Sequence, residues 1–258
     1  MNPELLDWSI IGPAFVAGLI VLSTHVPLGH EVLKRGIIFI DLAIAQIAGL
    51  GVIAAHSMNW EQDGYEVQIV AVAAALLAAF GLNWTEKRWP QQQEPLIGTL
   101  FILAATGGIL LLAGNPHGSE HLKELLVGQI LWSTWESLIP TAALYVVLLS
   151  LWFLFRNRMG PLGFYVIFAI AITASVQIVG IYLVFASLII PALATRSLPG
   201  RKRLLVGYAT GATSFLAGIV LSAIFDLPTG AIVVWTMAGI SIVVGMTATN
   251  GAGQKATN

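Results

Sequence analysis

The chain has 258 residues, of which 57% are hydrophobic and only 10% are charged. Soluble domains carry about 25% charged residues, so a water-soluble globule is excluded, and the net charge of −1 gives no basic field for nucleic acid. The chain has no cysteine, which excludes disulfides and thiolate metal sites and leaves carboxylate, imidazole, amide and backbone groups as metal ligands.

Apolar runs long enough to cross a bilayer, about 20 residues each, recur along the chain. They predict an all-α polytopic membrane helix bundle that forms a single transmembrane domain over residues 1–258, with 248–258 as a short tail. Nine spans are predicted: Trp8–Pro27, Ile37–His56, Val67–Trp84, Pro95–Gly114, Leu138–Phe155, Leu162–Gly180, Ile181–Thr195, Leu204–Phe225 and Ala231–Thr247. The sixth and seventh are nearly continuous, so the count is eight or nine. The amphipathic stretch Glu124–Trp135 predicts an interfacial approach to the fifth span.

Basic residues test this topology, because they concentrate in cytoplasmic loops. Eleven of the twelve fall on alternate loops or in the tail, and Lys123 alone lies on the other side. This split predicts that the N-terminus lies outside and the C-terminus in the cytoplasm. The outer loops are acidic, which concentrates cations, although acidic loops also remain by default once basic residues are kept inside. Four residues are candidates for an outer cation mouth: His56, His117, His121 and Asp226.

Asp41 is the sharpest candidate for chemistry, because an ionisable group within the bilayer is costly and is a functional hypothesis by default. It lies about 9 Å along the second span from Arg35, and Gln46 follows at mid-depth. The functional reading is a polar step on a cation path; the structural one is an Asp bonded to a neighbouring helix or reaching the interface. His25 lies beside Asp41 if the first two spans pair, which would suit zinc or manganese; a helix-anchoring role is the alternative.

Several segments, in this order, resemble the integral-membrane permease of ATP-binding-cassette importers for zinc, manganese or iron. They are PLGHEVLKRGIIFIDLAIAQIAGLGV (27–52), EPLIGTLFILA (94–104), LLVGQILWSTWESL (125–138), VGIYLVFASLIIPALATRSL (179–198) and FDLPTGAIVV (225–234). The resemblance covers nearly the whole chain. It implies a homodimer in the inner membrane of a bacterium that binds two cytoplasmic ATP-binding subunits, receives metal from an extracytoplasmic metal-binding protein and holds no permanent cofactor. No G-x-x-x-x-G-K-[ST] motif occurs, so the chain is expected to be a transport subunit and not an enzyme.

Two departures from the family pattern matter. The family's second span usually carries Asp-x-x-x-His, whereas Ala45 follows Asp41 at that spacing. Gln46 lies about 140° around the helix from Asp41 and cannot simply replace the histidine. The cytoplasmic loop before the sixth span is also short. Four arginines in the cytoplasmic loops are candidates for ATPase docking: Arg156, Arg158, Arg201 and Arg203.

The leading hypothesis is the membrane subunit of an ATP-driven importer of a divalent transition-metal cation, zinc slightly ahead of manganese. Asp41, Gln46 and His25 would line the path. Two alternatives stay open: a divergent, non-transporting paralogue that assembles with a membrane complex, and an ion-coupled secondary carrier.

Overall fold

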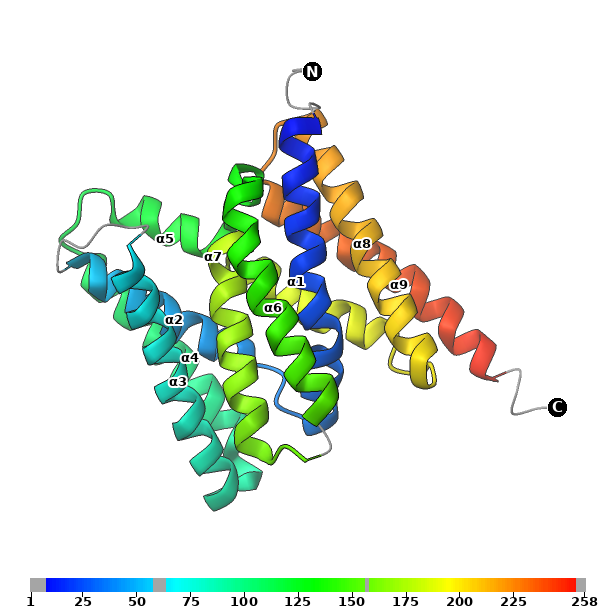
Figure 1. Cartoon of the computed structure of the whole chain (residues 1–258), viewed down its shortest axis with the longest axis horizontal. Coiled ribbons are helices and arrows are strands. Elements are labelled where there is room, and N and C mark those ends of the chain that lie inside the picture. The colour runs from blue at the N-terminus through cyan, green and yellow to red at the C-terminus, as the bar shows by residue number, and fades with distance from the viewer. Residues whose placement is uncertain (1–7, 58–63, 156–157, 254–258) are drawn as a thin grey trace.

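A computed structural model describes residues 8–57, 64–155 and 158–253 of the chain (Figure 1). Over these residues it contains helices and no strand, as predicted. The helices are α1 (Trp8–Arg35), α2 (Ile40–Ser57), α3 (Tyr65–Arg88), α4 (Gln93–Leu112), α5 (Gly118–Val127), α6 (Trp135–Phe155), α7 (Pro161–Ala194), α8 (Gly200–Phe225) and α9 (Thr229–Gly253), with short 3-10 turns at Pro90–Gln92 and Ile130–Trp132.

The described ranges hold seven helices that are long and apolar enough to cross a membrane, and α2 contributes a shorter apolar helix. This confirms the polytopic bundle. The predicted sixth and seventh spans are the two halves of α7, which is interrupted only where Gly180 adopts a non-helical backbone (φ 75°, ψ 165°). The count of apolar helices is therefore eight, with one of them broken.

α7 is the centre of the bundle. It packs against α1, α2, α3, α5, α6, α8 and α9, and 67% of its most apolar stretch is buried, against 17% for α4 and for α9. The outer helices α4, α6 and α9 instead expose large aliphatic side chains such as Leu110, Leu154 and Val243. A helix that is apolar all round and only partly covered by protein is typical of contact with lipid.

One end of the bundle gathers the basic loops, and we call it the basic end. Three contacts define it: Arg35 at the end of α1 reaches Glu86 at the end of α3, Gln93 at the start of α4 bonds Tyr165 at the start of α7, and His30 of α1 bonds Thr195 before α8. The basic end is in the lower part of Figure 1, away from the N-terminus.

At the opposite end, which the loop charges predict to face outward and which we call the outer end, the chain crosses itself at two glycines. Gly128, which ends α5, and Gly180, which breaks α7, both have positive φ. A Cβ at Gly128 would lie 2.2 Å from the carbonyl carbon of Val179, and one at Gly180 would lie 2.3 Å from the backbone nitrogen of Gly128. Only glycine fits either position. This crossing explains why the interfacial helix is Gly118–Val127 and not Glu124–Trp135.

Candidate functional site

Asp41 lies in the first turn of α2 and is fully buried. Helix α2 packs against α3, α4 and α7, so the carboxylate faces protein and not lipid. The backbone N–H groups of Asp41 itself and of Leu42 lie near the carboxylate, but neither of its oxygens has a well-aligned hydrogen-bond partner among the described residues. A buried charged group without a partner is costly, so this position is poised for a cation or a proton.

Glu94, in the first turn of α4, is a second carboxylate at the same end of α2. Its Oε1 accepts a hydrogen bond from the backbone N–H of Phe39 at 3.2 Å, and it lies close enough to Asp41 for their like charges to interact. Its other oxygen is buried and has no partner within the described part of the chain. Sequence reasoning missed Glu94, because a glutamate at the start of a span resembles an ordinary interfacial residue.

His25 is fully buried in α1. Its Nδ1 lies 2.7 Å from the carbonyl oxygen of Val21, and since a carbonyl can only accept, Nδ1 carries the hydrogen. That leaves Nε2 with a free lone pair, and no group in the described ranges bonds to it. His25 and Asp41 therefore do not hydrogen-bond to each other, and α1 packs mainly on α6, α7 and α8.

The described residues contain no group of three or more His, Asp or Glu side chains that could hold a metal ion. Gln46 is 9% exposed and lies between Asp41 and the outer half of α2. The helix path from Asp41 to Gln46 is about 7.5 Å, at 1.5 Å per residue. The joint role of Asp41, Gln46 and His25 at one metal site remains a prediction.

A cavity of about 920 Å³ opens toward the outer end between the α2–α3–α5 side and the α6–α7 side. Its polar lining is Gln68, Asn115, His121, Glu124, Gln129, Ser133, Ser137, Thr141 and Gln177. Gln177 is an exposed amide in the middle of α7, the most buried helix. It is exposed because its side chain lines the cavity. In the sequence, the only sign of this cavity on α7 is Gln177, a polar residue inside an apolar run. The lining contributed by α2, Val52 and Ile53, lies about 16 Å along the helix from Asp41.

The four residues predicted for the outer mouth are not all brought together. His121 lines the cavity and lies 3.8 Å from Glu124. His117 is on the surface, 3.4 Å from Glu120, and Asp226 is an exposed residue with a left-handed backbone that ends α8; neither is among the lining residues of this cavity. His56 ends α2, but its side chain lies outside the described part.

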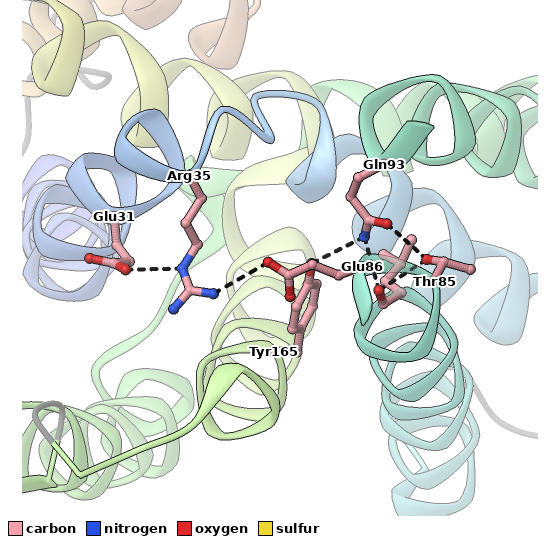
Figure 2. A network of polar contacts seen from close by, with 7 residues as sticks. Glu31, Arg35, Thr85, Glu86, Gln93 and Tyr165 are labelled. Carbon is pink, nitrogen blue, oxygen red and sulfur yellow. Dashed lines mark hydrogen bonds and ion pairs between the residues drawn. The ribbon is translucent and has the colours of Figure 1, made fainter. Parts of the chain in front are cut away.

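A polar network occupies the basic end (Figure 2). The guanidinium of Arg35 bonds Glu31 at 2.9 Å, lies 3.8 Å from Glu86 and stacks over the Phe164 ring at 4.3 Å. Alongside it, the buried Gln93 amide donates to the Leu82 carbonyl at 2.9 Å and to the Tyr165 hydroxyl at 3.1 Å, and accepts from Thr85 at 2.9 Å. These contacts tie α1, α3, α4 and α7 together at the basic end.

Three of the residues predicted for ATPase docking lie at this end: Arg158 in the turn before α7, and Arg201 and Arg203 in the first turn of α8. Arg158 and Arg201 are exposed. Arg203 donates to the Leu198 carbonyl at 2.9 Å and so braces the turn before α8. Arg156 lies outside the described residues.

Comparison with known proteins identifies the fold and the family. The sequence profile of the ABC 3 transport family matches residues 7–164 and 159–248. The manganese transport system membrane protein MntC of Halalkalibacterium halodurans is 26% identical over 90% of this chain and 85% of its own length. The high-affinity zinc uptake system membrane protein ZnuB of Haemophilus influenzae is 23% identical over 88% of this chain and 93% of its own.

A solved structure, PsaBC from Streptococcus pneumoniae in complex with Fab, superposes with a TM-score of 0.74 over 95% of both chains at 20% identity. An inward-facing conformation of a putative metal-chelate type ABC transporter superposes with a TM-score of 0.65 at 18% identity, over 92% of this chain and 87% of the other. At these identities the likeness shows a shared fold. The profile match covers nearly the whole chain, and the chain therefore belongs to the ABC 3 transport family of metal-transporter membrane permeases.

Proposed function

We propose that this chain is the permease subunit of an ATP-driven importer that carries a divalent transition-metal cation across a bacterial inner membrane. The observation that carries the proposal is the fully buried Asp41 carboxylate without a hydrogen-bond partner in the described structure. Relatives named for manganese, zinc and iron transport support the substrate class.

The transport path runs along α2. A cation enters the outer cavity, where amide and hydroxyl groups can replace part of its water shell, passes Gln46 and reaches Asp41 near the basic end. A cavity at one end and a side-chain network at the other are what an outward-open state requires. The N-terminus is then outside, and the basic end faces the cytoplasm.

The energy source is a separate ATP-binding subunit that docks on the basic end. Arg158 and Arg201 present exposed positive charge there, and the turn that includes Leu198 and Arg203 is a second contact. An extracytoplasmic metal-binding protein delivers the cation at the outer end, and two copies of this chain form the membrane unit. Movement of the ATPases beneath the basic end would alternate the opening of that end with the opening of the outer cavity.

Uptake of radioactive manganese or zinc into vesicles that contain the permease and its ATPase tests this function. Asp41→Asn keeps the size of the side chain and removes its charge, so uptake should be lost while insertion and assembly persist. Glu136→Gln, which removes an exposed carboxylate at the start of α6, is the matched control. Normal uptake by Asp41→Asn would refute the assigned path.

The second candidate is a membrane protein that assembles with a transporter but carries no metal. Ala45, where the family pattern has histidine, favours it. ATP hydrolysis by the complex separates the two functions, because only a transporter should hydrolyse ATP faster when metal and binding protein are added.

A further inference from the structure

The transported cation needs more ligands than Asp41 alone, and α2 does not provide the usual one. The position four residues after Asp41 shares its face of the helix, but it is occupied by Ala45, which is fully buried and has no ligand atom. Since α2 packs against α3, α4 and α7, the second ligand has to come from one of these neighbours.

Glu94 of α4 lies where a second ligand to the cation is required. One of its oxygens accepts the N–H of Phe39, two residues before Asp41, at 3.2 Å. The other oxygen is buried and has no partner in the described residues, as is true of both oxygens of Asp41. Three buried carboxylate oxygens at the start of one helix thus lack a hydrogen bond.

The start of α4 is held rigidly, which fixes where Glu94 can reach. The neighbouring Gln93 is 4% exposed and bonds Leu82 of α3 and Tyr165 of α7. A carboxylate on such a fixed turn is preorganised as a ligand. The backbone N–H groups at the start of α2 also favour negative charge at this point, and an arriving cation would favour the ionised form of both carboxylates.

We propose that Asp41 and Glu94 form a two-carboxylate binding site for the transported cation, with Mn²⁺ coordinated by oxygen atoms only. This inference rests on the proposed function and names the ligand that replaces the missing histidine. Carboxylate, carbonyl and water oxygens suit Mn²⁺, whereas zinc sites usually include imidazole or thiolate. Water and backbone carbonyls complete the coordination. The ranking of zinc ahead of manganese is thereby reversed.

The competing role for Glu94 is a helix cap that merely binds the N–H of Phe39. Two substitutions separate the roles. Glu94→Gln keeps an oxygen that can accept from Phe39 but loses the charge, whereas Glu94→Ala loses both. A ligand role predicts that Glu94→Gln weakens Mn²⁺ binding by at least about tenfold, without changing the helix content or melting temperature. A cap role predicts native binding by Glu94→Gln.

Mn²⁺ binding to the purified full-length permease in lipid nanodiscs can be measured by electron paramagnetic resonance, with Glu136→Gln as the control. Pulsed measurements also report nitrogen atoms bound to manganese, and the wild type should show none. Native affinity in Glu94→Gln, or a nitrogen ligand such as His25, would overturn the inference. If Asp41→Asn lowers uptake but Glu94→Gln does not lower Mn²⁺ binding, only this inference fails; if Asp41→Asn leaves uptake normal, the proposed function fails.

Discussion

The imidazole of His30 lies 3.0 Å from the hydroxyl of Thr195, so that α1 is bonded to the turn that precedes α8. Nδ1 of His30 donates to the carbonyl of Val26 at 2.7 Å, so Nε2 is an acceptor and shares the single hydroxyl hydrogen of Thr195 with the carbonyl of Pro191, 2.8 Å from the hydroxyl. A Cβ at Gly29 would lie 2.0 Å from the carbonyl oxygen of Leu188, so the backbones of α1 and α7 approach each other closely here. Five residues after His30, α1 ends at Arg35, which belongs to the polar network of the basic end.

The first prediction concerns this bond. If the ATPase docks on the turn before α8, His30 passes the motion of the turn to α1. Thr195→Val keeps the shape and removes the hydroxyl, at a cost of about 1 kcal/mol, so metal uptake should fall several-fold while ATP hydrolysis continues. Thr213→Val is the control, because the Thr213 hydroxyl is exposed and bonds only carbonyls of its own helix. Equal loss of uptake and hydrolysis would argue against a coupling role.

The second prediction concerns Arg35, which joins α1 to α3 and stacks on α7. Arg35→Met loses both the ion pairs and the cation–π contact, so the basic end should open more often. Since the chain has no cysteine, a single Ala45→Cys next to Asp41 can report opening. Its labelling by a charged thiol reagent from the basic side should rise several-fold. Arg88→Met removes an exposed cation at the same end and should leave labelling unchanged.

The third prediction concerns the glycine crossing at the outer end. Gly180→Ala forces a Cβ to 2.3 Å from the backbone of Gly128 and strains a positive φ, so the permease should unfold at a clearly lower temperature or fail to assemble. Gly239→Ala in α9 meets nothing within 4 Å and should stabilise the helix by up to about 1 kcal/mol. Thermal unfolding followed by size-exclusion chromatography compares them. A Gly180→Ala melt equal to wild type would show that the crossing adjusts freely.

The fourth prediction concerns Gln177, the amide that projects into the outer cavity. Gln177→Leu removes a group that can replace water around the cation, so the metal concentration for half-maximal uptake should rise about tenfold, equivalent to about 1.4 kcal/mol. The melting temperature should not fall, because leucine suits an apolar helix. Thr106→Val on the exposed face of α4 is the control. Unchanged uptake kinetics in Gln177→Leu would remove this cavity from the path.

Apolar runs predicted the helices well, because the length of a membrane span is set by the bilayer and is independent of tertiary contacts. The break in α7 was placed at the correct residue, since Gly180 ends one predicted span and Ile181 begins the next. What the sequence could not show is the backbone geometry of the break, with φ 75° and ψ 165° at Gly180. That geometry depends on a close approach to Gly128, which is 52 residues away.

For the candidate site too, the sequence predicted one part and missed another. The burial of Asp41 followed from the cost of a charge facing lipid, and the structure agrees. The proximity of Glu94 did not follow, because it depends on how α4 packs against α2. The hydrogen bond between Gln93 and Tyr165, which ties the start of α4 to α7, joins residues 72 positions apart. Local patterns identify a lone carboxylate, but not the neighbour that tertiary structure brings to it.

The break at Gly180 also gives α7 a hinge at the outer end, and both arms of the helix run from this hinge to the basic end. On one arm, residues 174 and 176–178 form part of the wall of the outer cavity; the other arm ends at Thr195, in the turn bonded to His30. A small tilt about this pivot would change the width of the outer cavity and the position of the docking turn in one movement. The two faces of the membrane would then communicate through a single helix, without a signal relayed from side chain to side chain.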